Sequence, residues 1–204
     1  MSEKNKLIYT EKYTTWNRDE ILSEVKDKLT RYRYEHVLRV ETCAIALAEE
    51  YGADVELCSL AAILHDYAKD IKRKKIEKLI EKGFLNEVLL PYGSQIWHGP
   101  AGAHYAKHKF GVTHEDVLNA ISQHTIGGQE MSLVSKILFV ADYIESGRAF
   151  KGVEEARRLA KKDLDREVYY KIKQTLIQLV KANRLIYPET LAVYNAWVKK
   201  GEDE

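Results

Sequence analysis

The fold is decided by the stretch Leu57-Cys-Ser-Leu-Ala-Ala-Ile-Leu-His-Asp-Tyr-Ala-Lys69. The part up to Leu64 is apolar nearly all round, which is typical of a helix buried in a core. This run continues into His65 and Asp66, and a carboxylate buried without a partner costs several kcal/mol. Asp66 therefore needs compensation, either from an internal salt bridge, for example with Lys69, or from a metal ion.

Three other apolar segments carry the same kind of misplaced polar residue. His36 interrupts an amphipathic segment, His124 ends the run 120–124, and Asp142 lies within the apolar run 136–144. Helices pack their apolar faces together, so these residues are predicted to meet at one centre. The imidazoles of His36 and His65, with the carboxylates of Asp66 and Asp142, form a nitrogen and oxygen donor set that suits Fe, Mn, Co or Zn better than Mg alone.

The rest of the chain also has helical patterning. Asn17 and Glu20 form a capping-box pattern before an apolar face, and Gly52 follows a long periodic segment. The predicted helices span about residues 17–29, 34–51, 55–69, 71–82, 100–110, 113–124, 131–146, 153–160, 164–182 and 189–199, with an irregular or broken helix over 84–97. No segment is patterned as a strand. We therefore predict an all-α single domain over 16–200, a flexible N-terminal arm over 1–15 and a frayed tail over 201–204.

Composition excludes several classes of protein. The 204 residues include 32 Lys and Arg against 31 Asp and Glu, a net charge of +1, so no global basic field attracts DNA. No apolar run approaches the roughly 20 residues that span a bilayer, and the N-terminus lacks a signal-peptide core. Cys43 and Cys58 form no Cys-x-x-Cys pair and are expected to be buried thiols. We expect a cytoplasmic protein and place His104, His108 and His114 at the surface.

The order of a lone His36, an adjacent His65-Asp66 and a distant Asp142 resembles the signature of the HD-domain metal-dependent phosphohydrolases. The resemblance covers residues 17–198 and is densest with the bacterial YqeK-type subfamily. The segments that carry it are Ala62-Ile-Leu-His-Asp-Tyr-Ala-Lys69, His98-Gly-Pro-Ala-Gly-Ala103, His124-Thr-Ile-Gly-Gly128, Lys136 to Glu145, Gly147-Arg148, Gly152 to Arg157, and Ile186-Tyr-Pro-Glu-Thr-Leu191. It implies a helical HD-domain bundle with a metal site in its core.

The implied activity of that subfamily is symmetrical hydrolysis of diadenosine tetraphosphate to two ADP, with attack by metal-activated water. The resemblance implies iron before manganese, cobalt or zinc, as one or two ions. Asp66 would bridge two ions if both bind. His98 and His124 would be ligands of the second ion or donors to the leaving phosphate, and the sequence leaves both roles open.

Substrate contacts are predicted around the same motifs. Lys69, together with Asp66, is expected to act in catalysis and to neutralise phosphate oxygens. Arg33, one turn before His36, and Arg148, after the Asp142 helix, suit bidentate phosphate contacts. The further substrate-binding candidates are Tyr67, Tyr143 and Tyr187 as walls for an adenine, with Gly128 and Ile186 from the resembling segments.

Two alternatives to this function stay open. One is another HD-domain hydrolase that acts on nucleotides, cyclic nucleotides or RNA ends. The other is a non-catalytic helical binding module, in which the buried polar residues form internal ion pairs. The sequence also leaves open the identity of the metal, the base specificity and a homodimer.

Overall fold

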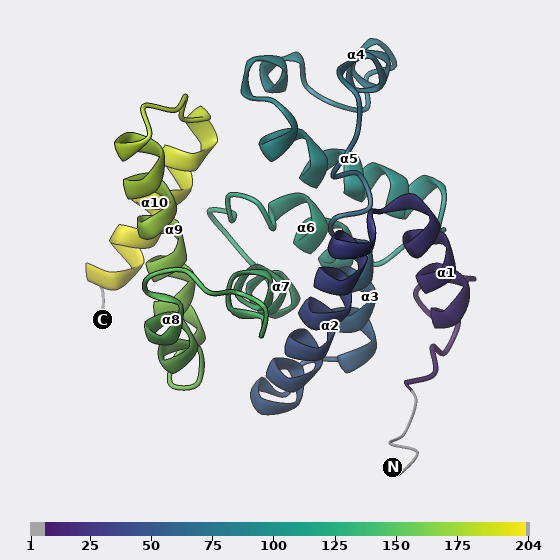
Figure 1. Ribbon diagram of the computed structural model, residues 1–204, viewed down its shortest axis with the longest axis horizontal. Coiled ribbons are helices and arrows are strands. Elements are labelled where there is room, and N and C mark those ends of the chain that lie inside the picture. Colours follow the sequence, from purple (N-terminus) through teal and green to yellow (C-terminus); the bar gives the residue numbers. More distant parts are fainter. Residues whose placement is uncertain (1–6, 203–204) are drawn as a thin grey trace.

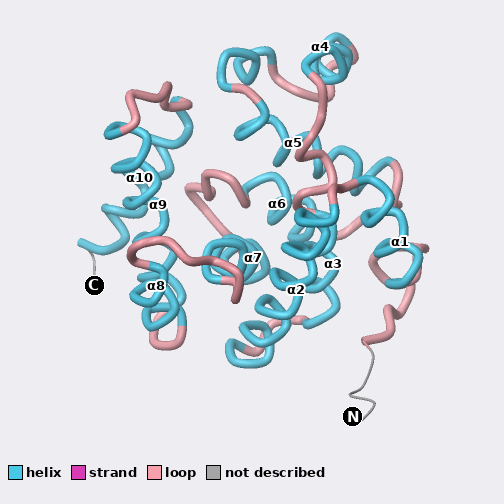
Figure 2. Tube along the Cα trace, viewed as in Figure 1, coloured by secondary structure: helices cyan, strands magenta, loops and turns pink. Residues whose placement is uncertain are grey.

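The computed structural model describes residues 7–202, which fold as a bundle of helices without a strand in that range (Figure 2). In chain order the elements are α1 (Arg18–Lys28), α2 (Arg31–Tyr51), α3 (Val55–Leu64), α4 (Arg73–Glu81), the 3₁₀ helix η1 (Glu87–Tyr92), α5 (Ser94–His108), α6 (Glu115–Gln123), α7 (Leu133–Ile144), α8 (Val153–Ala160), α9 (Leu164–Lys181) and α10 (Pro188–Glu202). The all-α prediction is confirmed.

The apolar helix α7 occupies the middle of the bundle. It packs against α2, α3 and α6, and also against α8 and α9. Figure 1 shows α2 and α3 on one side of it, and α8 to α10 on the other. Its residues Val134 to Ala141 are all buried except for the half-buried Lys136, as its sequence predicts. The polar residues of α2, α3 and α7 therefore lie inside one common core.

Several element ends differ from the prediction, because caps decide them. Helix α2 begins at Arg31, where the side chain of Thr30 accepts a hydrogen bond from Arg33 N. Ser132 caps α7 in the same way. Helix α6 is capped by His114 rather than Thr113, with Nδ1 accepting from Asp116 N. Side-chain oxygens and nitrogens at these positions satisfy otherwise unpaired N–H groups of the first turn.

Helix α5 is longer than predicted. It begins at Ser94, after Gly93 turns the chain at φ 74°, and continues through Pro100. The sequence predicts a helix from Pro100 only. Within the helix this proline costs one backbone hydrogen bond. The longer helix brings His98 onto the same element as Gly99 and Gly102, which face α6 and the end of α3.

The N-terminal segment is not a flexible arm over the part that the structure describes, while residues 1–6 and 203–204 lie outside the description. Tyr9 and Tyr13 are buried in the core. The hydroxyl of Tyr13 donates to Asp54 (2.7 Å) and Thr10 N donates to Glu56 (2.9 Å). Apolar burial and these hydrogen bonds attach residues 9–13 to the first turn of α3.

The two cysteines differ in exposure. Cys58 is fully buried, as predicted, while Cys43 is half-buried, and both thiols are free. Burial raises the pKa of Cys43 to about 11 and that of Cys58 to about 12, so both are protonated at neutral pH. Among the helices of residues 7–202, none combines the length and apolarity that crossing a membrane requires.

Candidate metal centre

His65 and Asp66 lie in the turn that follows α3. The helix ends at Leu64, and the chain continues in tight turns in which Tyr67 N donates to Leu64 O (3.1 Å) and Lys69 N donates to Asp66 O (2.9 Å). The predicted helix to Lys69 is therefore wrong in its last turn. Bonds from residue i to i+3 tighten the chain and place His65, Asp66 and Lys69 around one point.

The first candidate metal group consists of His36, His65 and Asp66. All three are buried, and one ligand atom from each lies within 4.8 Å of the others. His36 Nε2 is 3.8 Å and His65 Nε2 is 3.6 Å from Asp66 Oδ2. Neither Nε2 atom has a hydrogen-bond partner among the described residues. Buried polar atoms without partners are costly, and a divalent cation at this point would satisfy both.

Asp142 joins this group from α7. Its Oδ1 lies 3.2 Å from His36 Nε2, so the structure brings together the four residues that the sequence singled out. Arg148 donates to the same oxygen (2.7 Å) and to the carbonyl of Asp142 (2.9 Å). Lys171 Nζ lies 3.7 Å from Oδ2. Asp142 is thus held by two cationic side chains beside the cluster.

The second candidate group shares Asp66 and adds His98 and His124. These three residues are buried, with one ligand atom each within 4.8 Å of the others. Asp66 Oδ1 lies 3.2 Å from His98 Nε2 and 3.8 Å from His124 Nε2. The two Nε2 atoms face each other at 2.9 Å. Such a pair needs a proton or a cation on one of the nitrogens, which fits a second ion next to the first.

All four imidazoles are oriented by their other ring nitrogen. The Nδ1 atoms of His65, His98 and His124 lie 2.6–2.7 Å from the carbonyls of Ala62, Ser94 and Ile121, and Nδ1 of His36 lies 3.1 Å from Glu145 Oε1. Carbonyls and carboxylates only accept hydrogen bonds, so each Nδ1 carries the proton. Each Nε2 is then the nitrogen that faces the centre, as in metal sites whose ligands are fixed by outer hydrogen bonds.

The protonation states of the centre match those of metal ligands. Burial alone would raise the pKa of Asp66, but the neighbouring His65, His98 and Lys69 together outweigh burial and hold that pKa well below its ordinary value. For Asp142, burial is likewise outweighed, chiefly by Lys171, and the pKa lies well below normal. Burial lowers the pKa of His65, and burial with His98 lowers that of His124 further. Ionised carboxylates and neutral imidazoles are the forms that bind metals.

Four cationic side chains surround the cluster: Lys171 beside Asp142, and Arg33, Lys69 and Arg148. Arg33 Nη1 donates to Asp66 Oδ2 (2.8 Å), and Lys69 Nζ lies 3.7 Å from Asp66 Oδ1 and 3.1 Å from His98 Nε2. Arg148 pairs with Asp142 as described above. The internal ion pair weighed for Asp66 is therefore present alongside the histidines, but it leaves Nε2 of His36 and Nε2 of His65 without hydrogen-bond partners among the described residues.

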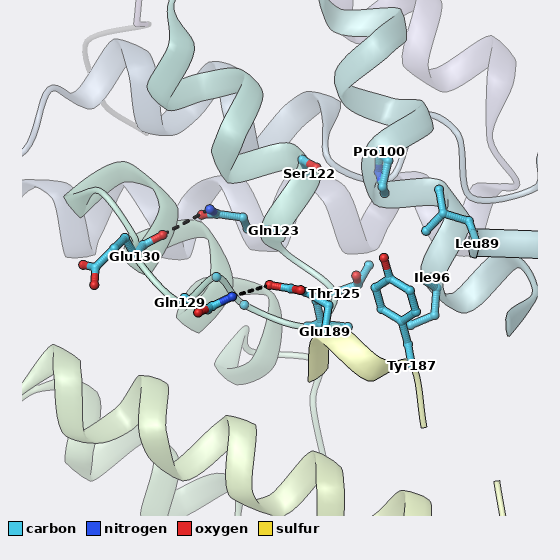
Figure 3. Close-up of a pocket in the computed structure, with 13 residues that line it drawn as sticks. Leu89, Ile96, Pro100, Ser122, Gln123, Thr125, Gln129, Glu130, Tyr187 and Glu189 are labelled. Atoms are coloured by element: carbon cyan, nitrogen blue, oxygen red, sulfur yellow. Dashed lines mark hydrogen bonds between the residues drawn. The ribbon is translucent and has the colours of Figure 1, made fainter. Parts of the chain in front are cut away.

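A cavity of about 930 Å³ opens from the cluster. Its inner wall includes Arg33, Asp66, Lys69, His98, His124, Asp142, Arg148 and Lys171, and it extends to Tyr92, Gln95, Gln178, Arg184 and Tyr187. A smaller cavity of about 260 Å³ lies beside it and shares Tyr187, Ile96 and Thr125 with it. Figure 3 shows Tyr187 at one side of the smaller cavity and Gln123 at the other. Polyanions could reach the cluster through the larger cavity.

Not every predicted substrate residue faces these cavities. Tyr67 is buried, its hydroxyl donates to Glu24 (2.7 Å), and it lines neither of these two cavities, so its role as an adenine wall stays a prediction. Tyr143 packs on Phe150 and, like Ile186, is absent from both linings. Gly128 lines the smaller cavity, and Tyr187 lines both.

The histidines placed at the surface stay away from the centre. His104 and His108 pack on Phe84, with ring centroids at 4.6 and 5.4 Å. His104 is half-buried and His108 is exposed. His114, expected to be solvent-exposed, is half-buried against Tyr13 (5.2 Å). Helix position alone does not reveal such partial burial.

Sequence reasoning missed two charged residues near the centre. Glu145 accepts a hydrogen bond from His36 Nδ1, and the sequence indicates it only as one more acidic residue in the apolar segment 136–145. Lys171 is buried on α9, where its Nζ donates to Phe139 O (2.6 Å) and lies 3.7 Å from the Phe139 ring centroid. A lysine within an otherwise charged helix gives no sign of burial.

Comparisons with known proteins agree with this geometry. The model of the HD domain matches residues 33–147. The chain is 42% identical over 185 residues to the symmetrical bis(5'-nucleosyl)-tetraphosphatase of Bacillus subtilis, covering 91% of this chain and 99% of that protein. It is 45% identical over 179 residues to the protein of the same name from Halalkalibacterium halodurans, covering 88% and 96%.

A solved structure shares the whole fold. It is the crystal structure described as a predicted HD superfamily hydrolase involved in NAD metabolism from Clostridium acetobutylicum, with a TM-score of 0.86 and 35% identity, covering 91% of this chain and 98% of that one. The matched range 33–147 contains every histidine and aspartate of both candidate groups. The chain therefore belongs to the HD-domain family, and within it to the group that contains these bacterial symmetrical tetraphosphatases.

Proposed function

We propose that this protein hydrolyses diadenosine tetraphosphate symmetrically to two ADP, using a divalent metal held at the centre described above. Relatives matched over nearly their whole length carry that activity in their names, at 42% and 45% identity. The single observation that carries the proposal is Asp66, which is shared by two buried groups of metal-ligand type at the inner end of a cation-lined cavity.

The metal ligands we propose are His36, His65, Asp66 and Asp142 for one ion, and Asp66, His98 and His124 for a second. Mixed imidazole and carboxylate donors favour iron, manganese, cobalt or zinc, and we propose iron as the physiological ion. When bound, such an ion supplies Lewis acidity, which polarises a phosphoryl oxygen and lowers the pKa of coordinated water.

The chain's own cationic residues bind the phosphates. Arg33 and Arg148 are half-buried beside the cluster and line the larger cavity. Such groups form strong charge-assisted bonds to phosphate oxygens. Lys69, between Asp66 and His98, adds a compact charge where negative charge develops in the transition state. These groups hold the tetraphosphate so that an inner phosphorus faces the cluster.

The bond changes balance with water alone. The water oxygen forms a bond to one inner phosphorus, and the bridging bond between the two inner phosphates breaks. One ADP leaves with the bridging oxygen, and the other carries the oxygen from water. The leaving group is a nucleoside diphosphate, so no strong general acid is required, and the proton lost by the attacking water passes to solvent in the cavity.

We also propose that the protein acts in the cytoplasm. Its two cysteines are both free, which suits a reducing compartment. The proposed substrate and product are nucleotides. A fractionation experiment that finds the activity in the soluble intracellular fraction would support this location, and recovery from the medium would oppose it.

Product identity tests the function directly. The purified protein, loaded with Fe²⁺ or Mn²⁺, should release ADP as the sole nucleotide from diadenosine tetraphosphate. A mixture of ATP and AMP, or no turnover beside rapid hydrolysis of another nucleotide, would contradict the proposal and favour another HD-domain hydrolase.

The Asp66→Asn variant should lose both this activity and the bound metal, because the carboxylate shared by the two groups is replaced by a weak neutral donor. His104→Ala provides a matched histidine variant outside the centre. It should keep wild-type turnover and metal content, as measured by product chromatography and elemental analysis. Full activity in Asp66→Asn would show that the centre is not catalytic.

A further inference from the structure

We infer that Glu145 is a positioning residue of the metal centre, which fixes the ring of His36 and strengthens it as a ligand. This inference rests on the proposed metal centre. Glu145 Oε1 lies 3.1 Å from His36 Nδ1, and both side chains are about 97% buried or more. An ionised carboxylate only accepts hydrogen bonds, so Nδ1 carries the proton and Nε2 faces Asp66 and Asp142.

His36 differs in this respect from the other three imidazoles of the centre. Their Nδ1 protons go to backbone carbonyls of their own helices, one turn earlier. His36 lies within the first two turns of α2, and its ring is fixed instead by a side chain from α7, 109 residues away in sequence. A carboxylate partner withdraws the Nδ1 proton more strongly than a carbonyl does and makes the opposite nitrogen a better donor to a metal.

The surroundings of Glu145 keep it ionised and in place. Arg39 Nε donates to Oε2 (2.7 Å), and Gly147 N donates to the same oxygen (2.5 Å). Burial alone would raise its pKa, but these two bonds, with that from His36, outweigh burial and lower it. Both carboxylate oxygens are therefore used, one for the ring and one for its anchors.

Gly147 shows how closely this arrangement is packed. A Cβ at residue 147 would lie 2.5 Å from Arg39 Nε, so a side chain there would displace the guanidinium that anchors Glu145. Glu145 follows Asp142 by three residues at the end of α7. One short segment therefore supplies a metal ligand, Asp142, and the support for a second ligand, His36, which belongs to another helix.

Glu41 offers a matched control. Like Glu145, it is a buried glutamate, 3% exposed. It accepts two hydrogen bonds from Arg18 (2.7 and 2.6 Å) and one from Ser59 (2.6 Å). Glu145→Gln and Glu41→Gln therefore remove the same charge next to an arginine, but only Glu145 contacts an imidazole of the centre.

The experiment measures the Mn²⁺ affinity of metal-free protein by chelator competition, together with the melting temperature of the metal-free form. Glu145→Gln should lower the affinity 10- to 100-fold, while Glu41→Gln should stay within about twofold of wild type although both variants melt earlier. Equal affinity losses in the two variants, or none in Glu145→Gln, would overturn the inference. Because no substrate is used, its failure is separate from a failure to produce ADP.

Two further measurements keep the test decisive if Glu145→Gln does not fold. Glu145→Asp retains the charge but withdraws the carboxylate by one methylene, and its Mn²⁺ affinity should lie below that of wild type. In wild-type protein loaded with Zn²⁺, nitrogen-15 NMR should show the His36 proton on Nδ1. Unchanged affinity in Glu145→Asp, or a proton on Nε2, would overturn the inference.

Discussion

At the scale of single residues, Glu167 is a buried acidic side chain that lies outside the proposed metal centre. It lies on α9, fully buried, and neither carboxylate oxygen has a hydrogen-bond partner among the described residues. Burial raises its pKa from 4.5 to about 8, and Lys171 one turn later offsets this only in part. Glu167 is therefore protonated in the folded protein at neutral pH, in contrast to Asp66 and Asp142.

This contrast predicts a pH-dependent gain of stability in Glu167→Gln. Between pH 4.5 and about 8 the folded protein holds a proton on Glu167 that the unfolded chain releases, so this group lowers stability progressively as pH rises through that window. Glutamine does not titrate. The difference in melting temperature between Glu167→Gln and wild type, measured by calorimetry, should therefore grow in favour of the variant from pH 5 to pH 8. A constant difference would show that Glu167 is ionised in the fold.

The sequence predicts single residues of the site well where a polar residue lies within an apolar segment. His36, His65, Asp66 and Asp142 were found because each interrupts an apolar segment, and the structure brings them together. The sequence does not show which way a tyrosine next to a motif points, and the hydroxyl of Tyr67 donates to Glu24. Lys171 gave no signal, because its burial follows from how α9 packs on α7.

At the scale of elements, the close approach of α5 to its neighbours determines how near His98 lies to His124. A Cβ at residue 99 would lie 2.7 Å from Ser122 O, and one at residue 102 would lie 3.1 Å from Ile121 Cγ2. Glycine at both positions lets α5 lie directly against α6, where His98 and His124 meet. The sequence pattern predicts both helices but not the contact between them, because this contact depends on the lack of a side chain at Gly99 and Gly102.

Gly99→Ala should therefore separate these helices. The added methyl group meets a backbone carbonyl, which cannot move aside as a side chain can, so we expect a loss of about 1–3 kcal/mol, or about 2–12 °C in melting temperature for a chain of this size. Turnover should fall as well, because His98 moves with α5. Lys107→Ala, at an exposed position of the same helix, should change neither quantity. Wild-type melting of Gly99→Ala would contradict the packing.

The ends of elements were the least predictable part of the fold. Helix α3 stops at Leu64 because the following residues close i to i+3 turns, and α5 continues through Pro100 because tertiary packing offsets one missing hydrogen bond. The segment around Tyr9 and Tyr13 was misread as an arm, since its short polar sequence conceals two aromatic anchors. Such local choices are decided by contacts far apart in the sequence.

At the scale of the whole molecule, the centre joins helices from across the chain. The ligand candidates come from α2, from the turn after α3, from α5, from the end of α6, and from α7. Helix α9 contributes Lys171, which lies beside Asp142. The all-α fold and the single domain followed from periodicity and from the few prolines. The shape of the cavity did not, because its outer wall is built from η1 and the connection between α9 and α10.

Metal removal should therefore destabilise the entire bundle. At a free metal concentration 100 times the Kd, binding to the folded state alone adds about 2.7 kcal/mol, which corresponds to about 5–11 °C in melting temperature. Treatment with a chelator should lower the melting temperature by this amount, and Mn²⁺ should restore it. Asp66→Asn should melt at the same temperature with and without Mn²⁺. A metal-dependent shift in that variant would locate the ion elsewhere.

Anomalous diffraction from a crystal grown with Mn²⁺ gives the most direct test of the proposed metal centre. We expect a peak within coordination distance of His36 Nε2, His65 Nε2, Asp66 and Asp142, and a second, adjacent peak beside Asp66, His98 and His124 if two ions bind. Anomalous density elsewhere, or none at these nitrogens and carboxylates, would contradict it.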